Sequence, residues 1–271
     1  MNDRQDALDG DYAQLQYAGQ DNLKVRIETH KKYTLPQVDF VDWVLDRLEW
    51  RGDEWVIDVG AGDGQYGRAV KERCGFYLAA DLYLGMLRDL DGEGLIRLNL
   101  DAAAVPLADD ALDVILANHM LYYVEDKDPA YAGFSRVLRP GGRLLAATNS
   151  ELYMGELRVM HSRIAAQFGY AGKLDRLREG RSFTLENGQR SLERHFQRVE
   201  RFDLPSALVF SEAEPAVAYL ASFGDRLFDL LPSGVLWQEV AGALEERIDA
   251  HIAEHGEFRV SKLAGVFVCQ N

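Results

Sequence analysis

Four glycines in the stretch VIDVGAGDGQYG, residues 56–67, are the first sign of a ligand site. The apolar residues before them predict a buried strand, and the glycines predict a tight turn where a nucleotide-type ligand lies against bare backbone. The run G-x-G-x-x-G from Gly62 to Gly67 fits the dinucleotide fingerprint. The run G-x-G-x-G from Gly60, with Asp58 two residues ahead of it, fits a different cofactor. The glycines alone leave both cofactors open.

Acids at the ends of predicted strands separate these two alternatives. Asp81 ends the second predicted strand, at a distance from the turn that suits a carboxylate binding ribose hydroxyls in either cofactor. Asp101 ends the third predicted strand. A cofactor whose adenine amino group has no pyrophosphate behind it needs such an acid, whereas the dinucleotide of a dehydrogenase does not. Asp63 stands between the glycines, near the helix N-terminus where a phosphate would bind. A cationic ligand therefore fits the turn better than a pyrophosphate.

Alternating strand-like and helix-like segments must hold these residues in place. This alternation is typical of an α/β fold, in which helices cover both faces of a parallel sheet. Strands are expected at 54–60, 75–81, 94–101, 112–118 and 141–149. Helices are expected at 66–73, 84–90 and 128–140, the last closed by the breaker Pro140, Gly141 and Gly142.

Beyond residue 150 the alternation of strands and helices changes. The pattern predicts helices at 151–169, 185–196, 214–224 and 235–256, and two further strands at 199–210 and 257–269. We expect three parts: an N-terminal helical lid at 1–50, a cofactor-binding core at 51–150, and the remainder of the sheet with helical cap insertions at 151–271.

Composition narrows the class of protein. With 271 residues and 47% hydrophobic content, the chain is long enough for one large α/β domain, or for a core domain with a smaller cap. The net charge of −14 argues against nucleic acid, which proteins bind through basic surfaces. Cys74 and Cys269 belong to no Cys/His cluster, so neither a zinc site nor a disulfide framework is expected. Because the apolar runs are too short for a membrane span and the N-terminus has no signal pattern, we expect a cytoplasmic, soluble protein.

Five ordered motifs between about residues 54 and 150 resemble those of a known family. They are VIDVGAGDG, AADLYLGML, two that share NLDAAAVPLADDALDVILANHMLYYVED, and RVLRPGGRLLAATN. The family is the class I S-adenosylmethionine-dependent methyltransferases of the small-molecule type, which includes the ubiquinone and menaquinone biosynthesis methyltransferases. The resemblance implies S-adenosylmethionine as cofactor and a Rossmann-like methyltransferase fold, a doubly wound, mostly parallel sheet of seven strands with helical cap insertions.

The resemblance also implies which residues surround the methionine part of the cofactor. Gly60 and Gly62 would pass under it, and Ala61 between them counts as a cofactor-binding residue. Asn118, just past the fourth strand, would place its backbone near the methionine amino group. Asp58 would orient the turn or meet the amino group through water; alternatively, it only satisfies backbone amides of the turn.

A second group of residues is implied for the ribose and the adenine. Asp81 would bind the ribose hydroxyls, while Asp101 and the backbone of Ala102 would hold the adenine. Leu82, beside Asp81, would be a hydrophobic wall of the adenine pocket.

Three side chains in NHMLYYVED are candidates for catalysis. A sulfonium methyl is already activated, so the transfer is an in-line displacement that requires no metal, and the protein chiefly supplies position and a dry site. His119 could act as a general base toward a hydroxyl or an amine. It could equally hydrogen-bond within its loop and shape the pocket. Tyr122 and Tyr123 could take part directly or form pocket walls.

The segment before the first strand, at about 10–50, is helical in pattern and rich in aromatic residues, which could pack on the sheet edge or form a lid. Arg26 and His30, four residues apart on one helix face, could bind a carboxylate of the cofactor or of the acceptor, or could be surface residues. The absence of a basic groove favours a small organic acceptor. We expect neither a nucleic-acid nor a membrane partner, and the oligomeric state stays open.

Three rival functions remain at this stage. An NAD-linked oxidoreductase would use the same sheet topology. A catalytically silent S-adenosylmethionine-binding module would be a methyltransferase fold that serves as a partner or regulator. Its mark in the sequence would be a broken cofactor turn, and the turn is intact here. A polyamine synthase would carry an acidic motif where this chain has NHMLYY.

Overall fold

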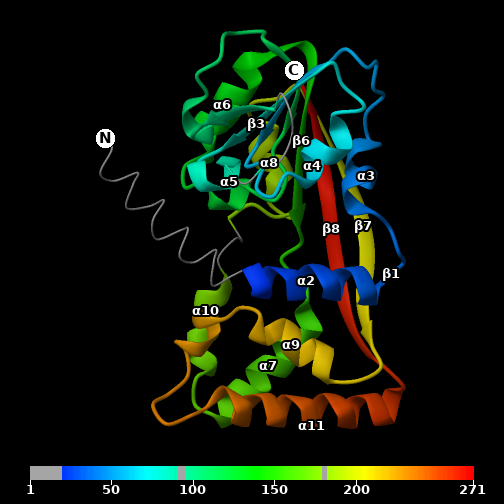
Figure 1. The fold of residues 1–271 in the computed structure, drawn as a ribbon, viewed down its shortest axis with the longest axis vertical. Helices are drawn as coiled ribbons and strands as arrows, with labels where there is room; N and C mark the ends of the chain where they lie inside the picture. Colours follow the sequence, from blue (N-terminus) through cyan, green and yellow to red (C-terminus); the bar gives the residue numbers. More distant parts are fainter. Residues whose placement is uncertain (1–19, 89, 91–94, 179–181) are drawn as a thin grey trace.

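The computed structural model describes residues 20–88, 90, 95–178 and 182–271 (Figure 1). A sheet flanked by helices forms the upper part of the molecule in this view, and a group of helices forms the lower part. Two long strands, β7 (Arg198–Phe210) and β8 (Phe258–Gln270), run through both parts and join them.

The described residues form one eight-stranded sheet in the order β1-β7-β8-β6-β5-β2-β3-β4. The neighbours in the run β4-β3-β2-β5-β6 pair in parallel, and β8 is antiparallel to both β6 and β7. The doubly wound, mostly parallel sheet predicted from the sequence is therefore confirmed, with one short strand more than the seven expected. The other strands are β1 (Thr34–Leu35), β2 (Trp55–Val59), β3 (Phe76–Asp81), β4 (Ile96–Asn99), β5 (Leu112–Leu116) and β6 (Leu138–Asn149).

Two expectations about element boundaries were wrong. The helical pattern of 10–50 is interrupted at β1, because Thr34 and Leu35 pair with the edge of β7. The fifth predicted strand begins before Gly141: α6 ends at Val137, and β6 starts at the next residue. The ladder between β5 and β6 shifts register here, and Pro140 lies in this irregular stretch. A bulge tolerates proline because it needs no ladder hydrogen bond at that position.

Helices cover both faces of the sheet because successive strand residues point to opposite sides. Ile57 of β2 packs in a core with Tyr131 of α6, whereas its neighbour Val56 packs in a second core with Val44 of α3. The helices are α2 (Gln20–Tyr33), α3 (Phe40–Leu45), α4 (Gln65–Val70), α5 (Leu84–Arg88), α6 (Lys127–Val137), α7 (Gly155–Gln167), α8 (Gly188–Leu192), α9 (Glu214–Ala221), α10 (Asp225–Phe228) and α11 (Trp237–His255). Short 3-10 turns are η1 (Ala102–Ala104), η2 (Leu121–Tyr123) and η3 (Ala171–Arg178).

The lower part is a helical cap with a core of its own. Leu157 of α7 and Leu244 of α11 pack in it with Leu208 of β7 and Val260 of β8. Helix α2 lies between the sheet and α9, in contact with α9 and β7 (Figure 1). Within the described residues, no helix is long and apolar enough to cross a membrane.

The carboxyl ends of the parallel strands face this cap. Strand β6 ends at Asn149 and leads into α7 of the cap (Figure 1). Because β2 to β5 run parallel to β6, the residues that follow them lie at the same edge. Open α/β sheets bind their ligands at this edge.

Candidate functional site

The glycine turn after β2 is tightly held at this edge. The backbone amides of Gly60 and Ala61 both donate to the carbonyl oxygen of Ala80, at 2.8 and 3.0 Å. Gly60 and Gly62 have φ angles of 74° and 56°, a conformation that side chains disfavour. A Cβ added to Gly60 would lie 2.7 Å from the Cβ of Met120. Met120 therefore packs against Gly60, whereas a Cβ on Gly62 would have no neighbour nearer than 3.8 Å, so the backbone is open at Gly62.

Asp81 at the end of β3 faces this turn. One carboxylate oxygen accepts from the amide of Gly62 at 3.1 Å and the other from the amide of Tyr83 at 3.0 Å. Burial raises the pKa of Asp81, and these hydrogen bonds oppose the shift. Leu82 is 42% exposed, and its backbone carbonyl accepts from the side-chain Nδ2 of Asn99 at 2.8 Å. The acid predicted for the ribose therefore lies beside the turn.

Asp58 is a buried carboxyl within β2. Its partner is the hydroxyl of Tyr77 on β3, which donates to it at 3.0 Å. Burial raises the pKa of Asp58 to about 7. A Cβ on Gly67 would lie 2.5 Å from the Tyr77 hydroxyl, so glycine at this position makes room for the pair. Sequence analysis missed Tyr77, because the pair depends on how β2 and β3 lie together.

The residues predicted to hold the adenine follow β4. Asp101 is exposed, and one of its carboxylate oxygens accepts from the amide of Ala103 at 2.9 Å, which caps η1. Ala102 is buried at the start of that turn. The amide of Leu100 donates to the Asp81 carbonyl at 3.0 Å, which ties this loop to the ribose acid.

Two buried polar atoms near the glycine turn lack a hydrogen-bond partner among the described residues. The side-chain oxygen of Asn118, after β5, accepts from the amide of Ala147 at 2.9 Å, but its Nδ2 has no acceptor. The hydroxyl of Tyr66 on α4, within the electrostatic reach of Asp58, is also unpartnered. Leaving such groups unsatisfied is costly, so both fit a polar ligand such as an amino-acid moiety. Sequence analysis expected the Asn118 backbone rather than its side chain, and no spacing singled out Tyr66.

His119 adopts a left-handed conformation with a φ of 55°. Its amide donates to the carbonyl of Ala147 at 2.9 Å, and its ring packs 5.4 Å from that of Phe40 on α3. Burial lowers the pKa of His119 to about 4. The ring is therefore neutral at pH 7, and it is a weak base. Left-handed non-glycine residues are uncommon and cluster at functional sites.

The two tyrosines of η2 differ in their surroundings. Their rings lie 4.6 Å apart, but Tyr123 is 71% exposed whereas Tyr122 packs against the sheet core. Burial, with a smaller contribution from Tyr123, raises the pKa of Tyr122. Of the two, only Tyr122 is placed to line an interior site.

Arg26 and His30 face inward, so they are not the surface residues that one alternative expected. A guanidinium nitrogen of Arg26 donates to the carbonyl of Ser222 at 2.7 Å. The Nε2 atom of His30 lies 3.4 Å from the Tyr219 hydroxyl on α9. The first residues of the predicted lid, 1–19, lie outside the described residues.

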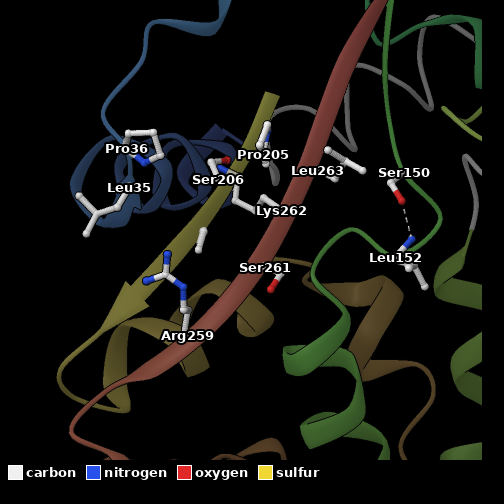
Figure 2. A pocket seen from close by; sticks show the side chains of 11 residues that line it. Leu35, Pro36, Ser150, Leu152, Pro205, Ser206, Arg259, Ser261, Lys262 and Leu263 are labelled. Carbon is white, nitrogen blue, oxygen red and sulfur yellow. Dashed lines mark hydrogen bonds between the residues drawn. The ribbon is translucent and has the colours of Figure 1, made fainter. Parts of the chain in front are cut away.

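A groove of about 460 Å³ lies along the β7–β8 ribbon (Figure 2). Its lining includes Leu35 and Pro36 beside β1, Leu263 and Arg259 of β8, and Ser150 after β6. None of the residues predicted to bind the cofactor lines it. In the part of the chain that the structure describes, no three His, Cys, Asp or Glu side chains are grouped to hold a metal ion.

Comparison with known proteins gives this site a class. A family model described as a methyltransferase domain matches residues 57–146. The chain is 39% identical over 116 residues to a malonyl-acyl-carrier protein O-methyltransferase of Methylococcus capsulatus, which covers 38% of this chain and 40% of that protein. It is 36% identical over 115 residues to a ubiquinone/menaquinone biosynthesis C-methyltransferase of Vibrio vulnificus, which covers 38% and 44%. The chain thus spans about two fifths of the length of these relatives.

Solved structures agree on the fold. The YcgJ protein from Bacillus subtilis superposes with a TM-score of 0.56 at 16% identity, over 85% of this chain and 97% of that one. The cyclase SpnF superposes with a TM-score of 0.50 at 17% identity, over 85% and 80%.

The matched segment agrees with the class that the five motifs indicated. Residues 57–146 match the model of a methyltransferase domain, and the two relatives are named methyltransferases. The NAD-linked oxidoreductase and the silent binding module gain no support from these matches. SpnF shares the fold and is named a cyclase, so the fold alone does not define the reaction.

Proposed function

We propose that this chain transfers a methyl group from S-adenosylmethionine to a small organic acceptor. The observation that supports this most is the position of Asp81, a buried carboxyl held against the amide of Gly62 in the glycine turn. An acid at this edge serves ribose hydroxyls. The curated relatives, each named a methyltransferase, support the same reaction class.

Each cofactor group has a candidate partner in this proposal. Asp81 accepts from the ribose hydroxyls, and Asp101 with the Ala102 backbone holds the adenine. The backbone of the turn at Gly60 and Gly62 lies along the methionine part. The Nδ2 of Asn118, which lacks an acceptor among the described residues, donates to the carboxylate of that methionine part.

The protein's contribution to the reaction is position and the exclusion of water. When bound, the cofactor supplies a methyl group already activated by its sulfonium. The half-buried rings of His119 and Tyr122 exclude water and shape the acceptor side. A pKa of about 4, caused by burial, suits His119 to this role better than to that of a general base.

The acceptor is a small molecule, free or attached to a carrier. The net charge of −14 disfavours nucleic acid as the acceptor. The names of the two relatives refer to a malonyl group on a carrier protein and to quinone biosynthesis. We keep the division into a lid at 1–50, a core at 51–150 and a cap-bearing remainder at 151–271 as part of the proposal.

Isothermal titration calorimetry with S-adenosylhomocysteine and with NAD tests the cofactor. We expect micromolar affinity for the former and no heat with the latter. At saturating excess, S-adenosylhomocysteine should stabilise the fold by about 2 to 4 kcal/mol through mass action. Binding of NAD alone, or of neither ligand, would contradict the proposal.

A further inference from the structure

Three nitrogen-bearing side chains converge between α2, α9 and β8. Arg26 and His30 lie about one turn apart on α2. Lys262 reaches from β8 to the end of this helix, where its ammonium donates to the hydroxyl of Thr34 at 2.9 Å. The charges of Lys262 and Arg26 both act on His30. Residues from opposite ends of the sequence thus form one cluster, which we call the cation cluster.

The cation cluster has no countercharge in the part of the chain that the structure describes. No described carboxylate forms an ion pair with Lys262 or Arg26, and Arg26 donates to a backbone carbonyl instead. Burial alone lowers the pKa of Lys262 to about 8, with no acid to raise it. The carbonyls at the end of α2 supply only a partial negative charge. Arg26 and Lys262 are both half-buried, and partly desolvated cations without an anion cost stability, so the arrangement needs a reason.

His30 adds a buried donor to the cluster. Burial lowers its pKa to about 4, so the ring is neutral at pH 7 and carries one proton. The hydroxyl of Tyr219 lies 3.4 Å from Nε2 of His30, and either atom can be the donor. Nδ1 of His30 is buried and has no partner among the described residues. An anion beside Nδ1 would select the tautomer with the ring proton on Nδ1 and the Tyr219 hydroxyl as donor to Nε2.

A row of tyrosines connects the cluster with the predicted position of methyl transfer. Tyr153 lies before α7, and its pKa is raised by burial and then by the charges of Tyr219 and Tyr122. Tyr153 is therefore within electrostatic reach of both. Tyr219 lies 3.4 Å from His30 of the cluster, and Tyr122 follows two residues after Met120, which packs against Gly60 of the glycine turn. An acceptor bound along this row would have one end at each site.

We propose that the cation cluster is a carboxylate-binding subsite for the methyl acceptor, with Lys262 and His30 as the donors and Tyr219 holding the His30 ring. The acceptor is then an organic acid, anchored by its carboxylate while its methyl-accepting group lies toward the glycine turn. This inference rests on the proposed function. The cofactor is the other source of a carboxylate, but its methionine part is assigned to the turn and to Asn118.

Binding of benzoate and of benzamide, its uncharged analogue, tests the subsite. With saturating S-adenosylhomocysteine and the full chain, benzoate should raise the melting temperature and benzamide should not. Lys262→Met and His30→Gln should each weaken benzoate binding about tenfold or more and leave the affinity for S-adenosylhomocysteine within about twofold. Arg259→Met is the matched control. Arg259 and Lys262 belong to the same strand and both line the groove of Figure 2, but only Lys262 acts on His30.

Each other result overturns a defined part of the account. Weakened binding of S-adenosylhomocysteine in Lys262→Met would make the cofactor carboxylate the occupant and remove the acceptor subsite. Loss of benzoate binding in Arg259→Met, with binding kept in Lys262→Met and His30→Gln, would place the anion site at the Arg259 end of the groove and remove the cluster as its site. Binding of S-adenosylhomocysteine without any response to benzoate would remove this inference alone, whereas failure to bind S-adenosylhomocysteine would remove the proposed function as well.

Discussion

The two ends of the proposed active site differ in how their charges are satisfied. At the glycine turn, Asp81 accepts from two backbone amides and Asp58 from the hydroxyl of Tyr77. At the cation cluster, the Lys262 ammonium donates to a hydroxyl, the Nδ1 of His30 has no described partner, and no described carboxylate faces either group. The first end is organised before any ligand arrives, whereas the second is completed by its ligand. A preorganised glycine turn suits a cofactor that binds in every turnover. A cation cluster without a countercharge suits the selection of an acceptor that carries a negative charge.

The largest effect is expected from removing the acid at the organised end. Asp81→Ala should lower the affinity for S-adenosylhomocysteine by about 30-fold or more, because two charge-assisted hydrogen bonds to the ribose are lost. Calorimetry measures this directly. Asp101→Ala, which removes an exposed carboxyl, is the control and should cost less. An unchanged dissociation constant in a folded Asp81→Ala protein would end the ribose assignment.

A smaller effect is expected at His119, between the two ends. His119→Gln should raise the KM for the acceptor about tenfold and change kcat by less than about threefold, because the half-buried ring shapes the pocket. Affinity for S-adenosylhomocysteine should be preserved. A large loss of kcat with an unchanged KM, together with a lost pH dependence of kcat, would instead identify His119 as a general base.

Asp58→Asn tests the buried carboxyl of the turn through stability. The folded-state pKa of Asp58, about 7 because of burial, lies above the unfolded value, so wild-type stability falls as the pH rises from about 4 to about 7. Because asparagine carries no charge, the variant does not lose stability over this pH range. It should be more stable than wild type by about 1 to 2 kcal/mol at pH 8, with little difference near pH 4. Urea unfolding at both pH values measures the difference. A variant less stable at pH 8 would show that the charged form is needed in the fold.

The smallest effect is expected at Tyr123. Because its side chain is 71% exposed, Tyr123→Phe should change the affinity for S-adenosylhomocysteine, the KM and kcat by less than about twofold. Tyr122→Phe, at the half-buried neighbour, should have the larger effect on the acceptor KM. Equal losses in both variants would contradict the separation of the two rings.

The sequence predicted the organised end well because its signals are local. The glycines after β2 and Asp81 after β3 follow buried strands directly, so the parallel order of the sheet brings them together. Strand β1 was missed because two residues carry no period of their own, and its pairing is set by the edge of β7. Tyr77 was missed because its contact with Asp58 depends on packing between strands.

The cation cluster could be predicted only in part. Arg26 and His30 share a helix face, and that spacing is visible in the sequence. Lys262 and Tyr219 lie far along the chain, in β8 and α9, and reach α2 only because the β7–β8 ribbon carries the cap beneath it (Figure 1). Lys262 shares its strand with Arg259 and Ser261, so the sequence does not single it out, and periodicity alone gives it no partner.

A crystal structure of the complex with S-adenosylhomocysteine tests the central claim most directly. The account predicts ribose hydroxyls on Asp81, and the amino-acid part between the glycine turn and Asn118, whose Nδ2 then gains an acceptor. The cation cluster should stay free of the cofactor. A cofactor carboxylate on Lys262, or a ligand bound in the groove of the β7–β8 ribbon, would contradict it.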